Sequence, residues 1–186
     1  MAVEFNLPTY LTLLRIALIP LLAVIFYLPW TYANFTCAAI FLLAGITDWL
    51  DGYLARRMGQ ETAFGAFLDP VADKLMVAFV LVLLVEQEST PYLTVPAAII
   101  IGRELTIASL REWMAEIGQR AKVQVSQLGK WKTTAQMTAI TLLLYGESFA
   151  GLPIKTLGYW LLYVAAILTL WSMVNYLTAA IATLRE

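Results

Sequence analysis

The sequence predicts an all-α integral membrane protein, folded as a bundle of six transmembrane helices with a polar cavity at its cytoplasmic edge. Hydrophobic residues make up 61% of the 186 residues and charged residues only 13%, whereas soluble globular proteins average about 45–50% and about 25%. The hydrophobic residues gather into six long stretches, and a helix that crosses a bilayer needs about 20 mostly apolar residues. This composition excludes a disordered chain, a basic nucleic-acid-binding protein and most soluble enzymes of this length.

The six predicted spans follow one another with short connections between them. In order, they cover residues 9–28, 36–56, 71–85, 93–114, 133–145 and 154–182. The third and fifth approach membrane-spanning length only when their polar ends are included. Helix-interrupting residues punctuate the series at Pro29, Gly59, Pro91, Gly146 and Pro153. Because no linker, low-complexity segment or internal repeat separates the spans, we expect a single domain over residues 1–186.

Basic residues are unevenly distributed among the connections. The second-to-third and fourth-to-fifth connections carry, with their edges, Arg56, Arg57, Arg120, Lys122, Lys130 and Lys132. The first-to-second and third-to-fourth carry no basic residue, and the fifth-to-sixth carries only Lys155. Because cytoplasmic loops are enriched in Lys and Arg, we expect a multi-pass protein of the inner membrane with both termini in the cytoplasm. The first basic residue is Arg15, so we expect no cleavable signal peptide.

Histidine and cysteine usage narrows the possible chemistry. The chain has no histidine and one cysteine, Cys37. It therefore cannot form an intrachain disulfide, and it lacks the ligands that zinc and most iron sites use. The 12 basic and 13 acidic residues nearly balance, so the net charge indicates no nucleic-acid partner.

All four aspartates of the chain lie close together in the sequence. Asp48 and Asp51 are three residues apart in the second predicted helix, and Asp69 and Asp73 are four residues apart at the start of the third. Each pair therefore lies on one helix face. Two helices joined by a short cytoplasmic connection should be antiparallel neighbours, so both pairs should face one cavity at the cytoplasmic membrane edge.

Four carboxylates at such a place need a cation. Each costs about 2.5–3.5 kcal/mol at the centre of a membrane helix, and less near the edge. Mg²⁺ prefers oxygen ligands and is bound by a few carboxylates together with substrate phosphates. Four carboxylates suffice for two ions bridged by shared oxygens, an arrangement used in phosphoryl transfer. We therefore predict a site for Mg²⁺ or Mn²⁺, with two ions.

Simpler interpretations exist for the individual residues. Asp69 precedes a proline, a common helix start, and Asp48 or Asp51 alone could pair with Arg56 or Arg57. Gly52 costs up to about 1 kcal/mol in a helix interior. It either leaves room for a bulky ligand such as a nucleotide or allows close helix packing. The spacing of the four aspartates together favours the metal site over caps and separate ion pairs.

The aspartates belong to a longer pattern with fixed spacing. It reads Asp48-x-x-Asp51-Gly52-x-x-Ala55-Arg56, then eight residues, then Gly65-x-x-x-Asp69-x-x-x-Asp73. This pattern resembles the signature of the CDP-alcohol phosphotransferase family at every defined position. Residues 6–15, 103–104, 110–116 and 129–137 are similar to family members that use sn-glycerol 3-phosphate as the acceptor. Thr9 departs from the asparagine of many relatives and is assigned no role.

The resemblance implies a reaction and a role for each signature residue. A hydroxyl of sn-glycerol 3-phosphate would attack the lipid-side phosphorus of CDP-diacylglycerol, giving phosphatidylglycerol phosphate and CMP in phospholipid biosynthesis. The four aspartates of the signature would bind metal, and Asp73 would also be the general base. Gly52, Arg56 and Thr62 match positions that contact the cytidine diphosphate. The resemblance also implies a homodimer.

An acceptor that carries a phosphate should meet a second, cationic pocket. Arg111 and Lys130 are the leading candidates, because arginine binds phosphate through paired hydrogen bonds and lysine as a point charge. Arg103 and Lys132 are weaker candidates. The basic residues have alternative roles, as partners of Glu104 in an ion-pair network or as anchors for anionic headgroups. Arg15 could reach the diphosphate or snorkel to the headgroups.

Two other functions fit parts of the sequence. An ion transporter would also place acidic residues in a membrane, but these acids sit at one edge and no second set of broken helices matches them. The same family chemistry could use another acceptor, such as inositol phosphate, a phosphatidyl lipid or an amino alcohol. The aspartate pattern does not distinguish among acceptors; the basic residues and the similarity along the chain favour glycerol 3-phosphate.

Overall fold

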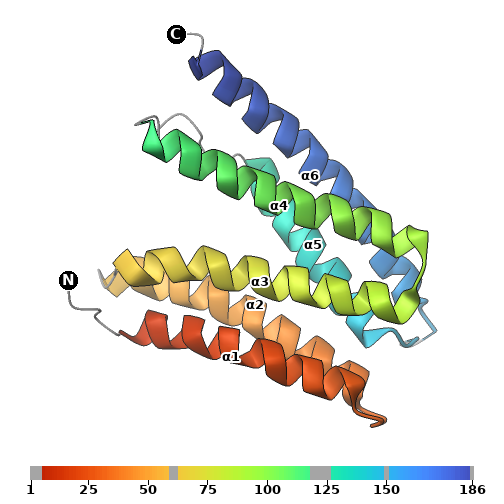
Figure 1. Cartoon of the computed structure of the whole chain (residues 1–186). Coiled ribbons are helices and arrows are strands. Elements are labelled where there is room, and N and C mark those ends of the chain that lie inside the picture. Colours follow the sequence, from red (N-terminus) through yellow and green to blue (C-terminus); the bar gives the residue numbers. More distant parts are fainter. Residues whose placement is uncertain (1–5, 59–62, 118–126, 149–150, 185–186) are drawn as a thin grey trace. The chain divides into compact units, whose positions relative to one another are not determined.

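The computed structural model describes residues 6–58, 63–117, 127–148 and 151–184, which form six α-helices (Figure 1). The helices are α1 Leu7–Tyr27, α2 Ala33–Met58, α3 Ala63–Glu88, α4 Pro91–Glu116, α5 Gln127–Tyr145 and α6 Ile154–Leu184. The prediction of an all-α chain with six helices is confirmed. Most of the helices extend past the predicted spans, because polar residues continue the helix beyond its apolar part.

The start of α3 differs most from the sequence prediction. The helix was expected to begin near Asp69 and Pro70, but it begins at Ala63, so Pro70 lies inside it. A proline removes one backbone hydrogen bond and usually kinks or ends a helix. Pro70 neither starts nor ends α3. Because Asp69 also lies inside this helix, its interpretation as a helix cap is wrong.

Three of the six helices are long and apolar enough to cross a membrane, judged by length and composition within the described ranges. These segments are Thr9–Tyr27, Pro91–Glu116 and Ile154–Thr178, with mean hydropathies of 2.1, 1.5 and 1.7. In α2 the apolar segment is shorter, Ala33–Asp48, because acidic and basic residues follow it. The membrane character of the chain is supported, whereas a bundle of six spans stays a prediction.

The chain divides into two compact units. The first contains Met1–Leu84 and Thr141–Lys155, and the second contains Val85–Ile140 and Thr156–Glu186. Helices α1 and α2 and most of α3 therefore belong to the first unit, and α4 with most of α5 and α6 belongs to the second. The single domain expected over residues 1–186 stays a prediction.

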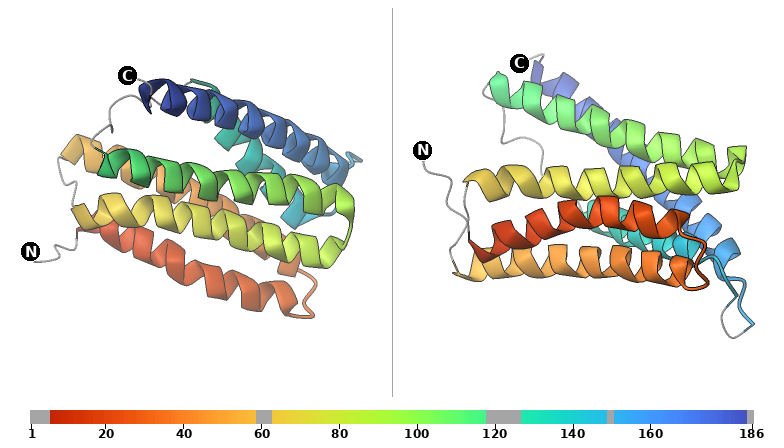
Figure 2. Two further views of the ribbon diagram at one scale, coloured as in Figure 1. Left: turned by 45° about the horizontal axis from the view of Figure 1, so that its top comes forward. Right: turned by 60° about the horizontal axis from the view of Figure 1, so that its bottom comes forward.

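Three neighbouring helices, α1, α2 and most of α3, make up the larger part of the first unit (Figure 2). The carboxamide oxygen of Asn6 caps α1 by accepting hydrogen bonds from the backbone N–H and the hydroxyl of Thr9, at 3.1 and 2.7 Å. Thr9, which had no assigned role, therefore helps to fix the start of α1. Leu22 and Phe41 are fully buried in the core of this unit.

Helices α4 and α6 are in contact within the second unit. The buried residues of α4 recur every three, four or seven positions, which places them on one helix face: Leu93, Pro96, Ala97, Ile100, Ile107 and Met114. The hydroxyl of Tyr163 on α6 donates to the backbone carbonyl of Tyr92 at 2.9 Å, and that of Tyr159 donates to Glu88 at 3.2 Å. The first of these hydrogen bonds links α6 to the start of α4, and the second links α6 to Glu88, the last residue of α3.

Large hydrophobic side chains point outward from both units. Val24 is 61% exposed and Val82 is 58% exposed in the first unit, and Ile167 is 63% exposed in the second. Soluble monomers rarely expose extended apolar surface. An apolar exterior around buried polar residues is the arrangement expected of helices that face lipid.

Candidate active site

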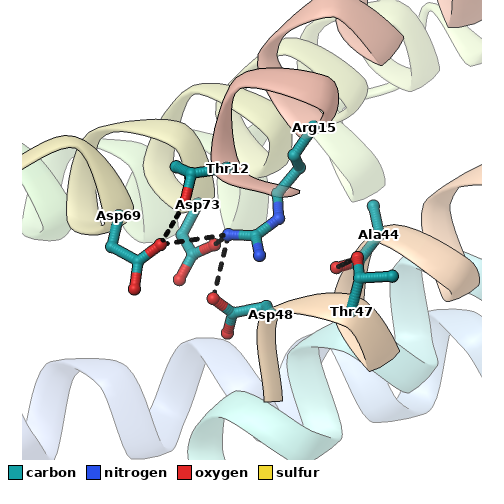
Figure 3. Close-up of polar contacts among 7 residues, drawn as sticks. All are labelled: Thr12, Arg15, Ala44, Thr47, Asp48, Asp69 and Asp73. Carbon is teal, nitrogen blue, oxygen red and sulfur yellow. Dashed lines mark hydrogen bonds and ion pairs between the residues drawn. The ribbon is translucent and has the colours of Figure 1, made fainter. Parts of the chain in front are cut away.

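An acidic cluster lies where α1, α2 and α3 meet in the first unit (Figure 3). We define the acidic cluster as Thr12, Arg15, Asp48, Asp69 and Asp73. Nη1 of Arg15 lies 2.6 Å from Oδ1 of Asp73, 2.9 Å from Oδ1 of Asp48 and 3.9 Å from Oδ1 of Asp69. Three carboxylates from two helices thus converge on one nitrogen atom from a third.

Helix periodicity explains why these side chains meet. Thr12 and Arg15 are three residues apart on α1, and Asp69 and Asp73 are four apart on α3, so each pair occupies one face. The hydroxyl of Thr12 donates to Oδ1 of Asp69 at 2.8 Å. The predicted meeting of the second and third helices through their aspartates is therefore seen for Asp48, Asp69 and Asp73.

The cluster contains both buried and accessible groups. The Arg15 side chain is 2% exposed, whereas the side chains of Asp48, Asp69 and Asp73 are 36%, 37% and 44% exposed. The carboxylates can therefore be reached from outside while the arginine cannot. Because Arg15 is buried and ion-paired, its interpretation as a headgroup-snorkelling residue is wrong.

The donor set of the acidic cluster suits a hard cation. Its carboxylate oxygens are the ligands that Mg²⁺ and Mn²⁺ prefer, and the guanidinium of Arg15 already shows that a positive group fits among them. Among the side chains that the structure describes, which exclude that of Asp51, no three acidic residues are arranged to hold a metal ion directly. The carboxylates are instead arranged around Arg15.

Several predicted site residues lie outside the described side chains. Asp51, Gly52 and Arg56 are on α2, and Asp51 and Gly52 follow Asp48 by three and four positions, which places them near the same helix face. Their side chains are not among those described, and Thr62 lies outside the described residues altogether. Their roles stay predictions.

A second polar cluster lies in the other unit and has the opposite sign. We define the basic cluster as Arg103, Glu104, Arg111, Lys132, Ser172 and Tyr176. Oε1 of Glu104 accepts hydrogen bonds from Arg103 at 2.9 Å and from Lys132 of α5. The described ion pairs of Glu104 therefore go to these two residues, which confirms the predicted network but not a pairing with Arg111.

Tyr176 of α6 lies beside both arginines of the basic cluster. The guanidinium carbons of Arg103 and Arg111 are each 5.6 Å from the centre of its ring. Arg103 also donates to the hydroxyl of Ser172 at 2.8 Å, and Nη2 of Arg111 lies 3.4 Å from the Tyr176 hydroxyl. The tyrosine thereby keeps two like charges close together through cation–π contacts.

The basic residues differ in how accessible they are. The side chains of Lys132 and Arg103 are 5% and 10% exposed, whereas Arg111 is exposed. Nε of Arg103 is buried without a hydrogen-bond partner among the described residues. The exposed Arg111 is therefore the described arginine of the cluster that an anion can reach. Lys130 is on α5, but its side chain is not described.

Sequence reasoning missed three residues of these clusters. Thr12 was noted only as part of a similar stretch, and Ser172 and Tyr176 were not noted at all. The signal for Thr12 was its position three residues before Arg15. Ser172 and Tyr176 lie four residues apart on a strongly apolar helix. Two polar side chains on one face of a membrane helix indicate a polar interaction with a neighbouring helix.

Comparison with known proteins assigns the chain to a family. The CDP-alcohol phosphatidyltransferase family model matches residues 5–171. A CDP-diacylglycerol–glycerol-3-phosphate 3-phosphatidyltransferase of Escherichia coli K12 is 53% identical, covering 98% of this chain and 99% of that protein. Proteins of the same name are 53% identical in Haemophilus influenzae, over 98% of this chain and 97% of that protein, and 54% identical in Salmonella choleraesuis, over 95% and 96%. With this match along almost its entire length, the chain belongs to the CDP-alcohol phosphatidyltransferase family.

Proposed function

We propose that this chain transfers the phosphatidyl group of CDP-diacylglycerol to sn-glycerol 3-phosphate, forming phosphatidylglycerol phosphate and CMP. The observation that carries the proposal is the 53% identity over 98% of the chain to enzymes named for this donor and acceptor. The acidic cluster supports it, because it presents accessible carboxylates from two helices at one place.

The reaction exchanges one bond to phosphorus for another. The acceptor hydroxyl forms a new oxygen–phosphorus bond, the bond to the CMP oxygen breaks, and the hydroxyl proton goes to a base. We assign that base to Asp73, whose side chain is the most exposed of the three described aspartates at 44%. A carboxylate within hydrogen-bond reach of the hydroxyl accepts its proton as the new bond forms.

Asp48, Asp51, Asp69 and Asp73 would together hold two Mg²⁺ or Mn²⁺ ions, which would neutralise the charge of the diphosphate and the leaving CMP. Thr12 orients Asp69 from behind through its 2.8 Å hydrogen bond. Gly52 would leave space for the cytidine diphosphate, and Arg56 and Thr62 would contact it. These assignments follow from the family signature carried by residues 48–73.

The basic cluster supplies the properties needed to bind the acceptor phosphate. Arg111 is exposed and its guanidinium lies against the ring of Tyr176, so its orientation is fixed before a ligand arrives. We propose that Arg111 and Lys130 contact the phosphate. Glu104 holds Arg103 and Lys132 in place, so these two would act through the positive charge of the basic cluster.

We further propose that the chain crosses the inner membrane six times, acts as a homodimer and keeps its termini and active site at the cytoplasmic face. The basic residues near the second-to-third and fourth-to-fifth connections support this orientation. It also suits the substrates, because glycerol 3-phosphate and the nucleotide are water-soluble while the acyl chains stay in lipid.

The test is CMP release by the purified full chain in detergent. CDP-diacylglycerol would be supplied with glycerol 3-phosphate, inositol 1-phosphate or serine, each with Mg²⁺ and with EDTA. We expect CMP only with glycerol 3-phosphate and metal. Release with another acceptor would overturn the acceptor assignment but keep the aspartate chemistry, and no release from folded protein would make ion flux in vesicles the next assay.

A further inference from the structure

Arg15 occupies the position at which the carboxylates of the acidic cluster converge. Its Nη1 atom is within 3 Å of an oxygen of both Asp48 and Asp73 and is 3.9 Å from one of Asp69. We propose that Arg15 is an internal counter-ion that competes with the divalent cation for Asp48 and Asp73. This inference rests on the proposed metal site and assigns Arg15 a function within it.

The burial of Arg15 explains why it pairs with the carboxylates. At 2% exposure its guanidinium has almost no contact with solvent, and an arginine cannot become neutral by losing its proton. A buried charge is costly unless an opposite charge compensates for it. Likewise, carboxylates gathered at one point repel one another unless a cation lies between them. Arg15 and the aspartates therefore stabilise each other.

The same contacts set up the competition. A Mg²⁺ ion needs oxygen ligands at about 2.0–2.1 Å, and the accessible candidates include the Oδ1 atoms that Arg15 uses at 2.6 and 2.9 Å. A divalent ion and a guanidinium on the same two oxygens would repel each other strongly at this separation. An ion that takes these Oδ1 atoms therefore displaces Arg15 from at least one of the two carboxylates.

Asp69 is bound in a different way and need not change its partner. Its Oδ1 accepts a hydrogen bond from the neutral hydroxyl of Thr12, and Arg15 lies farther away at 3.9 Å. A neutral donor orients a carboxylate without competing with a cation for its charge. Arginine and metal thus compete for the carboxylates of Asp48 and Asp73, while Thr12 of α1 continues to orient Asp69.

The experiment measures metal binding without substrate. Free Mn²⁺ would be followed by its electron paramagnetic resonance signal as it binds to the full chain in detergent, for the wild type, Arg15→Gln and Arg15→Lys. Thermal unfolding of each protein would be recorded in EDTA and in Mn²⁺. We expect Arg15→Gln to unfold at a lower temperature in EDTA, to bind Mn²⁺ about tenfold more tightly, and to gain more stability from Mn²⁺ than the wild type does.

Lys74→Gln provides the matched control. It removes one positive charge from the residue that follows Asp73 on α3. Its Mn²⁺ affinity therefore shows how much the loss of a nearby positive charge changes metal binding when the contacts of Arg15 are kept. We expect its Mn²⁺ affinity to change by less than about twofold, because an interaction through solvent is strongly screened. Arg15→Lys keeps the charge but not the planar group, so its Mn²⁺ affinity should lie between those of the wild type and Arg15→Gln.

The outcomes separate this inference from the proposed function. Equal or weaker Mn²⁺ binding by Arg15→Gln would overturn the competition, as would a change matched by Lys74→Gln. If Arg15→Gln does not fold, equal Mn²⁺ affinity of Arg15→Lys and the wild type would overturn it. If no protein binds Mn²⁺, both the competition and the metal site fail, and CMP release then decides separately whether the chain is a transferase.

Discussion

The two polar clusters have the same arrangement of charges with the signs reversed. In the acidic cluster, one arginine that is 2% exposed lies among three described aspartates. In the basic cluster, Glu104, 23% exposed, is bonded to Arg103 and Lys132, with Arg111 nearby on Tyr176. Each cluster keeps like charges together by means of one central residue of the opposite sign.

This comparison shows how an apolar protein can hold charged sites without neutralising them. Three aspartates and one arginine leave a formal charge of −2, and two arginines, one lysine and one glutamate leave +2. The central residue lowers the cost of burial but leaves charge for a ligand. The first cluster is therefore suited to cations and the second to anions such as phosphate.

The largest expected effect is the loss of turnover on removal of the proposed base. Asp73→Asn keeps the shape of the side chain and its contact with α1, but an amide cannot accept the proton. We expect kcat for CMP release to fall by about 10²–10⁴-fold. Lys74→Gln, the neighbouring charge change on α3, should keep near-normal turnover, and near-normal turnover of Asp73→Asn would remove it as the base.

The next largest effect should come from the centre of the basic cluster. Glu104→Gln leaves Arg103 and Lys132, which are 10% and 5% exposed, without their counter-charge. Breaking a buried pair in this way costs about 3–5 kcal/mol, so the midpoint of thermal unfolding should fall by about 6–20 °C. Glu112→Gln is the matched control, because Glu112 is an exposed residue of the same helix. Equal midpoints for the two variants would show that the ion pairs at Glu104 do not stabilise the second unit.

Metal affinity should be sensitive to the hydrogen bond from Thr12. Thr12→Val replaces the hydroxyl, which lies 2.8 Å from Asp69, by a methyl group of similar size. Groups that orient a metal ligand from behind contribute about 10–100-fold to metal affinity, so Mn²⁺ binding should weaken by about tenfold. Thr47→Val is the control, since the hydroxyl of Thr47 donates to the Ala44 carbonyl within α2 and lies next to Asp48 in the chain. Unchanged Mn²⁺ affinity of Thr12→Val would show that Asp69 is not held by this bond when metal is present.

The sequence and the structure agree on local features and differ on long-range ones. The six helices and the family are confirmed, because long apolar stretches and a motif of fixed spacing are both read from residues that are close together in the sequence. The extra turns at the start of α3 were missed because Pro70 was taken as a helix start. The partners of Arg15 were missed because they lie 33 and 58 positions away, and no local pattern links them. For the same reason, Tyr176 could not be connected to Arg111, which is 65 positions away.

A smaller kinetic effect is expected at the exposed arginine of the basic cluster. Arg111→Gln should raise KM for glycerol 3-phosphate by about tenfold with little change in kcat, as expected when a contact made equally in the ground and transition states is lost. Lys130→Ala should act in the same direction. If KM is unchanged in both variants, these residues are membrane anchors, and the acceptor phosphate is bound elsewhere.

The smallest expected effect separates the ring of Tyr176 from its hydroxyl. Tyr176→Phe keeps the ring against which Arg103 and Arg111 pack at 5.6 Å and removes only a long contact of 3.4 Å to Arg111. Its KM for glycerol 3-phosphate should therefore stay within about twofold of the wild type. Tyr176→Leu removes the ring, and a cation–π contact at a partly exposed site contributes about 0.5–1 kcal/mol, so KM should rise by about threefold. An equal rise of KM in Tyr176→Phe and Tyr176→Leu would mean that the hydroxyl, and not the ring, positions Arg111, because both variants lose the hydroxyl and only the second loses the ring.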